Sequence, residues 1–310
     1  TFTPIHMSKT ARNKRTLFKP LPNDGTPSWP ISHLTTHQPS NTIPNTTPRR
    51  AVLVSTGAYS PIHLGHVHIL HQAKQTLETH GWHVMGGYIS PSHDFYVGPK
   101  SKSHRTSFAN ASHRVAMAEL AVQAHDWLAI AKWESRHPNR WPDFTEVAQE
   151  LSKHLTKEPP LTVFFVCGSD HANKCGLDHW GAKGLGLVVV ARDRDGVAVT
   201  NKTKAEKHVF WCTNEGPLKT SSSTKVRQAI EQNDAPALNA LMNPHVFQYM
   251  QQHQLYGTEL LPETKESKGE ATVQKGVTHG EEIILPLSTA ALSSTATATP
   301  ATTASTTTAT

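Results

Sequence analysis

The stretch AVLVSTGAYSPIHLGHVHIL, residues 51–70, decides the fold of this chain. Its first residues form a β-branched apolar run, which is typical of a buried strand. The run ends at Gly57, where the missing Cβ lets the main chain approach a ligand closely, and Pro61 prevents the turn from re-entering the strand. A helix is expected to open near Leu64 and Gly65. The stretch therefore predicts a strand, a glycine turn and a helix whose N-terminus faces that turn.

Such a helix N-terminus binds phosphate, because its unpaired N–H groups and the positive end of its dipole point at the turn. His63 and His66 lie three residues apart on one face and add two ring N–H donors. The pattern G-x-[FY]-x-P-x-H-x-G-H is long, and its required strand–turn–helix context is present. The chain holds 21 histidines in 310 residues, so chance or a partial metal site are alternatives. No acid or cysteine nearby completes a zinc set.

The rest of the central region alternates strand-like and helical runs. Short Val/Ile/Leu-rich runs without in–out alternation indicate strands covered on both faces, and therefore a parallel sheet. The expected strands are Ala51–Ser55, Val84–Ile89, Trp127–Ala131, Leu161–Cys167 and Leu185–Ala191, and the expected helices are Leu64–Thr79, Ala111–Ala124 and Phe144–Leu155. The fold class is therefore α/β, a Rossmann-like doubly wound parallel sheet, with ligands at the carboxyl ends of its strands.

Three short helices are expected after the sheet. They are Ser222–Gln232, Ala235–Met242 and His245–His253, and they form a C-terminal helical cap. Ser221 or Ser222 caps the first of them, which leaves its N-terminal N–H groups as a second anion site.

The two ends of the chain have a different composition from the centre. Residues 1–48 contain scattered prolines and no period, and residues 258–310 pass into a Thr/Ala/Ser-rich tract. We therefore expect a disordered basic N-terminal arm (1–48), a folded central domain (49–257) and a disordered tail (258–310). The formal net charge of +6 is concentrated in the arm. A solvated arm is favoured over a transit peptide or a nucleic-acid contact, because prolines interrupt any amphipathic helix and stacking aromatics are lacking.

The cysteines and the apolar runs bear on the cellular environment. Cys167, Cys175 and Cys212 show no C-x-x-C spacing, which indicates reduced thiols in an intracellular protein. The longest apolar run, Leu185–Ala191, is far too short to span a membrane. We expect a cytoplasmic or nuclear protein rather than a mitochondrial one, with no membrane or nucleic-acid partner.

At this point the chain resembles the nucleotidylyltransferases that carry the H-x-G-H signature, and among them the nicotinamide mononucleotide adenylyltransferases of the eukaryotic type. The first motif alone resembles the superfamily, and the resemblance implies that the central domain (49–257) is a nucleotidylyltransferase domain. Later segments narrow the resemblance and occur in family order over residues 51–257. These are ISPSHD (89–94) followed by Tyr96, SHRVAMAE (112–119), AKWES (131–135), VCGSD (166–170), TSSSTKVR (220–227) and HQLYG (253–257).

The resemblance implies transfer of the adenylyl group of ATP to nicotinamide mononucleotide, and also to nicotinate mononucleotide, in NAD biosynthesis (EC 2.7.7 class). The attacking phosphate oxygen is already ionised, so no general base is required. Catalysis then consists of aligning two polyanions and neutralising charge on the leaving pyrophosphate. A site of this kind is rich in N–H donors and cations.

The resemblance also implies roles for the ATP side of the site. His66, His63 and Arg227 are the expected catalytic residues. His63 is the less typical of the two histidines, because the eukaryotic enzymes commonly keep the second one. A lysine after the second strand is expected at the outer phosphates, and Lys100 and Lys102, in a lengthened loop, remain alternatives. The expected ATP-binding residues are Gly57, Ala58, Tyr59, Lys100, Lys102, Ser222, Ser223, Thr224 and Arg227.

On the mononucleotide side, Trp141 and Trp180 are expected to hold the pyridine ring, since a cationic ring stacks favourably on an indole face. Thr145 is the matching polar contact, with Phe144 as an alternative because the spacing is one residue longer than usual. Gly168 and Asp170 are expected at a ribose. Trp133 is interpreted as a structural residue, and Glu134 stays open between a structural and a ligand role. The pair His113–Arg114 is interpreted as helix packing with some influence on the phosphates.

Mg²⁺ is expected to arrive with ATP, with no dedicated protein ligands. ATP and nicotinamide mononucleotide are the expected substrates, and a homo-oligomer is usual in the family. Two alternatives stay open: a nucleotidylyltransferase of the same superfamily with a different phosphate acceptor, and a non-catalytic nucleotide-binding protein.

Overall fold

The computed structural model describes residues 19–34, 49–103, 107–155, 161–177, 184–191 and 203–259. Contacts within the chain divide it into Thr1–Pro262 and Glu263–Thr310, and every described residue belongs to the first of these units. Most of the predicted tail and a large part of the predicted arm lie outside the described residues.

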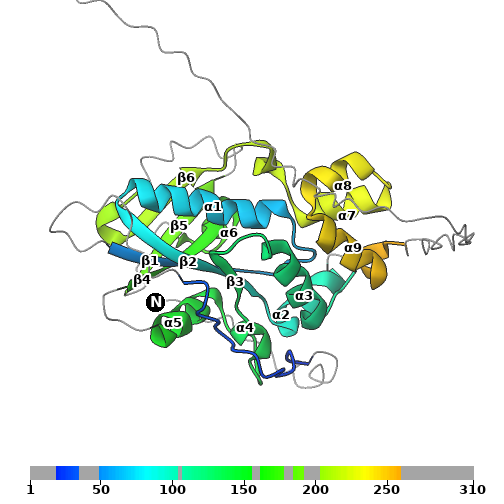
Figure 1. The fold of residues 1–310 in the computed structure, drawn as a ribbon, viewed down its shortest axis with the longest axis horizontal. Coiled ribbons are helices and arrows are strands. Elements are labelled where there is room, and N and C mark those ends of the chain that lie inside the picture. Colours follow the sequence, from blue (N-terminus) through cyan, green and yellow to red (C-terminus); the bar gives the residue numbers. More distant parts are fainter. Residues whose placement is uncertain are drawn as a thin grey trace, which may run out of the picture. The chain divides into compact units, whose positions relative to one another are not determined.

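A parallel sheet of six strands organises the described part of the chain (Figure 1). Its strands are β1 (Arg49–Gly57), β2 (Trp82–Pro91), β3 (Leu128–Ile130), β4 (Leu161–Gly168), β5 (Leu185–Ala191) and β6 (Val209–Thr213). The spatial order β3-β2-β1-β4-β5-β6 reverses direction next to β1, as in a doubly wound fold. The predicted fold class is confirmed, and β6 is an additional edge strand. Its five residues are too few to give a period in the sequence.

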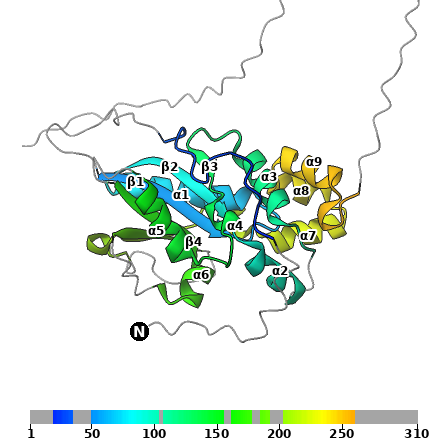
Figure 2. The ribbon, with the colours of Figure 1, turned by 90° about the horizontal axis from the view of Figure 1, so that it is seen from below.

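Both faces of the sheet are covered, as the continuous apolar strands predicted. Leu53 of β1 packs in one core with α1 (Leu64–Thr79) and α3 (Ala111–Val122). Its neighbour Val54 packs in the other core with α5 (Phe144–His154) and α6 (Ser169–Lys174). Figures 1 and 2 show α1 and α5 on opposite sides of the strands. The layered arrangement leaves the carboxyl ends of the strands and the loops after them as the place for a site.

The C-terminal cap consists of α7 (Ser223–Glu231), α8 (Ala235–Leu241) and α9 (Pro244–Gln252). Helix α9 lies against α3, where His113 Nδ1 lies 2.9 Å from Tyr249 Oη. The predicted cap is therefore present, with boundaries within a residue of those expected. Two short 3₁₀ turns, η6 (Pro217–Thr220) and η7 (Leu255–Gly257), precede and follow it, and a third, η5 (Ala205–Lys207), precedes β6.

Three helices stand where the sequence predicted no helix. The lengthened loop after β2 is largely helix α2 (Asp94–Ser103), which the Gly98–Pro99 pair concealed because that dipeptide usually ends a helix. The helix is fixed at its start, where the His93 ring accepts a hydrogen bond from the Phe95 amide at 3.0 Å. The short helices α4 (Trp133–Arg136) and α6 (Ser169–Lys174) follow β3 and β4.

The N-terminal segment 19–34, which we name the strap, corrects the prediction of a disordered arm. Trp29 is 5% exposed and belongs to the core on the α5 side of the sheet, and Leu21 packs against the core on the other side. The Tyr88 hydroxyl donates a 2.6 Å hydrogen bond to the Pro30 carbonyl. Figure 2 shows the strap, in dark blue, crossing in front of β3 toward α4 and α2. Its few apolar residues have no period, so only the surface that receives them reveals the contact.

None of the helices in the described ranges is long and apolar enough to cross a membrane.

Candidate active site

A crevice with two lobes lies at the carboxyl ends of the strands. The first lobe has a volume of about 490 Å³ and is formed by the β1–α1 turn, α2 and α7. The second lobe has a volume of about 330 Å³ and is formed by the ends of β1, β4 and β5 with the starts of α1 and α6. His63, His66 and Lys100 line both lobes. Because the lobes share these residues, we treat them as one site.

The two histidines of the first motif are oriented by the helix they begin. The His63 ring caps α1, since its Nδ1 accepts a hydrogen bond from the Gly65 amide at 3.1 Å. The His66 Nδ1 in turn accepts from the His63 amide at 3.1 Å. Each Nδ1 is thus an acceptor, so a neutral ring carries its proton on Nε2. Both Nε2 atoms are therefore N–H donors, as the phosphate-binding role requires.

The turn before α1 is shaped by Tyr59, which has a left-handed φ of 44°. Its hydroxyl donates to the Ser55 carbonyl at 3.0 Å, and its ring lies edge-on to His66 with centroids 4.9 Å apart. A Cβ on Gly57 would lie 3.1 Å from this ring. The glycine therefore makes room for the Tyr59 ring, which is an addition to the close ligand approach that the sequence predicted.

Helix α7 carries the second predicted phosphate-binding segment into the first lobe. Ser222, Ser223, Thr224 and Arg227 all line it. The Ser222 hydroxyl caps the helix by accepting from the Lys225 amide at 3.2 Å. Arg227 Nη1 donates to the Ser60 carbonyl at 2.5 Å, and Ser223 Oγ donates to the Pro61 carbonyl at 2.9 Å. The last motif is thereby fixed directly to the turn of the first.

The structure distinguishes the two candidate lysines. Lys100 lines both lobes, whereas the lining of neither lobe includes Lys102, which is exposed on the same helix. The Lys100 ammonium lies 5.3 Å from the centroid of the Tyr96 ring and 3.5 Å from its hydroxyl. Burial of Arg227 lowers the pKa of its guanidinium. No acidic residue is among the described residues that line the first lobe, so its charge is positive.

The predicted mononucleotide residues are only partly brought together. Gly168 and Asp170 line the second lobe. Trp141 lies outside both lobes, is 40% exposed, and stacks on Tyr96 with ring centroids 4.3 Å apart. Since Tyr96 also contacts Lys100, the indole is one side chain away from the crevice. Trp180 lies outside the described residues.

Thr145 and its alternative Phe144 have different surroundings. The Thr145 amide and hydroxyl both donate to the Asp143 carboxylate, which caps α5. The Phe144 ring stacks on Phe165 with centroids 4.7 Å apart and packs against His171. Phe144 is therefore a packing residue, and Thr145 stays the candidate for a polar contact.

Glu134 lines neither lobe, but its buried carboxylate contacts residues of other segments. It is 1% exposed, and the Ser90 hydroxyl donates to its carboxylate at 2.9 Å. Ser92 and Trp141 also hydrogen-bond to this carboxylate. Burial raises the pKa of Glu134 to about 7, while these hydrogen bonds and Arg114 oppose the rise.

Arg114 is confirmed as a packing residue, and its contacts explain why it is needed. It is fully buried and donates to the carbonyls of Ala58, Ser92 and Ala109. Its guanidinium also pairs with Asp94 at 2.7 Å. One side chain thus joins the β1–α1 turn, the end of β2 and the segment before α3.

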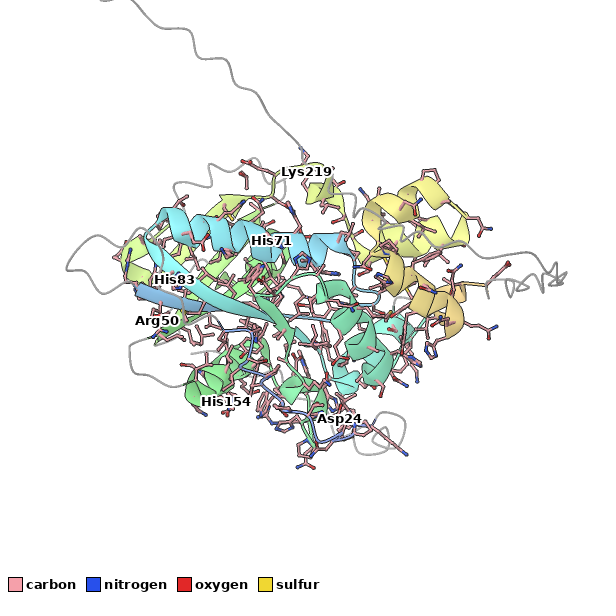
Figure 3. All side chains as sticks on the ribbon, viewed as in Figure 1. Asp24, Arg50, His71, His83, His154 and Lys219 are labelled. Carbon is pink, nitrogen blue, oxygen red and sulfur yellow. The ribbon has the colours of Figure 1, made fainter. Side chains whose placement is uncertain are left out.

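Asn214 is a residue of the second lobe that the sequence analysis did not single out. It is 5% exposed, its Nδ2 donates to the Lys219 carbonyl at 3.5 Å, and its Oδ1 has no hydrogen-bond partner among the described residues. It follows β6, the strand that was missed, so no expected element pointed to it. Lys219 lies above α1 in Figure 3.

The described residues contain no group of three His, Cys, Asp or Glu side chains that could hold a metal ion. The lining of the first lobe, with cationic, hydroxyl and imidazole groups, suits a ligand that brings its own negative charge.

A family model described as cytidylyltransferase-like matches residues 54–229, from within β1 to within α7. The chain belongs to this family. Over 227 residues it is 29% identical to the nicotinamide/nicotinic acid mononucleotide adenylyltransferase of Arabidopsis thaliana, with 67% of this chain and 90% of the relative covered. The relative of the same name from Oryza sativa subsp. japonica is 26% identical over 227 residues, with 66% and 86% covered. The matched region of the cytidylyltransferase-like family contains both histidines and the α7 motif.

Solved structures give a weaker likeness. The nicotinic acid mononucleotide adenylyltransferase of Plasmodium falciparum complexed with NaAD has a TM-score of 0.49 and 14% identity to this chain, with 67% of this chain and 98% of that one covered.

Proposed function

We infer that this chain is an adenylyltransferase that joins ATP to nicotinamide mononucleotide or nicotinate mononucleotide, releasing pyrophosphate and forming NAD or its acid counterpart. The observation that carries this inference is the similarity to the Arabidopsis thaliana relative over 90% of that protein's length. The positively charged lobe at the carboxyl ends of the strands agrees with it, because the reaction brings two phosphorylated substrates together.

The chemistry consists of one displacement at phosphorus. A phosphate oxygen of the mononucleotide forms a bond to the α-phosphorus of ATP, and the bond from that phosphorus to the bridging oxygen breaks. Pyrophosphate leaves with the electron pair, so no proton has to move. The protein's contribution is therefore alignment and charge neutralisation.

The first lobe supplies both. We assign the α- and β-phosphates to the Nε2 donors of His66 and His63, and the outer phosphates to Lys100, Arg227 and the N-terminus of α7. Ser222, Ser223 and Thr224 are assigned to the same phosphates. As negative charge develops on the leaving pyrophosphate, these groups lower the barrier without a covalent intermediate.

The second lobe and the Trp141 side are assigned to the two nucleosides. Asp170 offers a carboxylate to ribose hydroxyls, and Gly168 allows close approach at the end of β4. Trp141 is assigned to the pyridine ring, with Thr145 nearby, and Trp180 is assigned to the other face of the ring.

Mg²⁺ is proposed as a cofactor carried by ATP. The first lobe offers hydroxyl, imidazole and cationic groups but no carboxylate among its described lining residues, which fits a metal ion bound chiefly by phosphate oxygens. When bound, the ion neutralises part of the triphosphate charge.

The experiment is pyrophosphate release by the purified protein with Mg-ATP and, in parallel, nicotinamide mononucleotide, nicotinate mononucleotide or phosphopantetheine. The matched pair of variants is His66→Ala and His68→Ala, because His68 lies on the same helix but does not line either lobe. We expect turnover with the two pyridine mononucleotides that is lost in the first variant and kept in the second. Turnover with phosphopantetheine alone, or with none of the three, would contradict the proposed function.

A further inference from the structure

The strap holds the segment that follows β3 along most of its length. This segment is Lys132–Arg136, with the sequence KWESR. The Lys132 amide donates to the Ser28 carbonyl at 2.9 Å, and the Leu21 amide donates to the Ser135 carbonyl at 2.8 Å. Between these backbone bonds, the Trp29 and Trp133 rings stack with centroids 6.2 Å apart.

A charged contact closes the same interface. The carboxylate of Asp24 pairs with the ammonium of Lys132 at 3.2 Å and with the guanidinium of Arg136. Arg136 Nη1 also donates to the Thr26 carbonyl at 2.7 Å. Lys132 extends the network to Glu119 of α3 at 2.9 Å. Figure 3 places Asp24 at the outer edge of the molecule beside this segment.

Glu134 is the residue of the segment whose side chain contacts β2 instead of the strap. Its four neighbours in the segment contact the strap. Its own carboxylate is buried against β2, where it accepts hydrogen bonds from the Ser90 hydroxyl and the Trp141 side chain. A shift of the segment backbone would therefore move the hydrogen-bond partner of Trp141. The family model begins at residue 54, so the strap lies outside the part of the chain that it matches.

We propose that the strap is a positioning element of the mononucleotide site, which fixes Lys132–Arg136 so that Glu134 holds the Trp141 indole in place. This inference rests on the proposed function, because it assigns the strap to the pyridine side of that site. The residues that act are Asp24 and Trp29 on the strap, and neither lines the two lobes of the crevice.

The first test is the kinetics of Asp24→Ala in the full-length chain. Asp24 is half exposed, so its replacement leaves the cores intact. We expect the KM for nicotinamide mononucleotide to rise about 5-fold and the KM for ATP to stay unchanged, since a network of part-exposed ion pairs contributes modestly. Asp24→Glu keeps the charge and should restore the wild-type KM. Glu78→Ala, which removes the surface ion pair with Lys74 on α1, is the control and should change neither constant.

The second test asks whether the strap acts through Glu134. In a Glu134→Ala background, Asp24→Ala should have no further effect on the KM for the mononucleotide, because alanine has no acceptor for the indole N–H and the indole is already released. Independent effects that multiply, or an equal rise in the KM for ATP, would overturn the proposal.

The third test does not depend on turnover. In protein labelled with 5-fluorotryptophan, the ¹⁹F resonance of Trp141 is assigned by its loss in Trp141→Phe. We expect Asp24→Ala to shift or broaden this resonance and Glu78→Ala to leave it unchanged. An unchanged resonance in Asp24→Ala would reject the positioning role. If the wild-type protein failed to make a dinucleotide, the proposed function would fail, and this spectrum would still decide the role of the strap.

Discussion

Gly65 and Ser221 are packed so closely that a Cβ added to the glycine would lie 1.8 Å from the Ser221 Oγ. Gly65 is in the first turn of α1, and Ser221 immediately precedes the cap of α7. The glycine of the H-x-G-H motif is therefore required by a contact with a residue more than 150 positions away. Both residues line the second lobe, so this contact joins the start of α1 to the segment before α7 there.

The Gly65→Ala variant should lose both stability and activity. Alanine is a better helix former than glycine by about 1 kcal/mol, so an ordinary helical site would be stabilised. Here we expect a loss of about 1–3 kcal/mol from overpacking. Urea unfolding and pyrophosphate release measure the two effects. Adding Ser221→Ala in the same chain should recover most of both, and no recovery would mean that the close contact is not the cause.

Removing one partner of the Arg114–Asp94 pair should strongly destabilise the fold. Both side chains are buried, and Arg114 also serves three carbonyl groups, so Arg114→Met leaves a carboxylate and three acceptors without their donor. We expect a loss of about 3–5 kcal/mol in the free energy of unfolding. The control is Lys74→Ala, which removes a surface pair and should cost less than about 1 kcal/mol. Equal losses of stability in the two variants, measured by urea titration, would contradict the proposal that Arg114 stabilises the fold by joining three segments.

His63 has a capping role and a proposed phosphate role, and two variants separate them. Asparagine is a good N-cap residue, so His63→Asn should keep the stability within about 0.5 kcal/mol, whereas His63→Ala should lose about 1 kcal/mol. Both variants should lower kcat/KM about 10-fold, because each lacks the Nε2 donor. Thermal unfolding and steady-state kinetics give the two readouts. Full activity in His63→Asn would restrict this residue to capping.

Lys100 and Lys102 form a matched pair on one helix. Lys100→Ala should lower kcat/KM for ATP about 10- to 100-fold, because a hydrogen bond to a charged group contributes roughly 1.5–3 kcal/mol. Lys102→Ala should have little effect. Initial rates at varied ATP decide between them, and the reverse pattern would show that the lysines are wrongly assigned.

Glu134 predicts a pH dependence of stability. Its pKa of about 7 in the folded protein lies above the ordinary value of 4.5, so the folded state binds the proton more tightly than the unfolded state does. The contribution of Glu134 to the free energy of unfolding is fully present below about pH 4.5. It is lost as the pH rises through about 7, and the total loss is about 3 kcal/mol. Glu134→Gln should abolish this part of the dependence in urea titrations between pH 5 and 8. A variant with the wild-type slope would assign the dependence to another group.

The sheet, the first helix and the phosphate residues could be predicted from the sequence because local rules fix them. Continuous apolar strands require cover on both faces, and helix α1 has the bounds that the sequence predicted. The residues expected at ATP line one crevice because strand ends of a parallel sheet share an edge, and Lys102 is the exception. Their roles, unlike their positions, stay predictions.

The missed elements share a physical cause. Helix α2 contains Gly98–Pro99, and the strap contains few apolar residues without a period, so neither has a local signal of its structure. Glu134 contacts Ser90 of β2, and Asn214 lines the second lobe with the ends of other strands. The sequence did not indicate these surroundings, because they depend on segments distant in the chain. Tertiary packing, and not local propensity, stabilises helix α2 and the strap.

The sequence by itself determined the class of fold, the glycine turn and the inventory of donors and cations, because each depends on residues close together in the chain. Only the tertiary structure decided which lysine enters the crevice, why Gly65 has to be a glycine, and that residues 19–34 are held against Lys132–Arg136. These features depend on contacts between segments distant in sequence, and no local pattern encodes a distance between such segments.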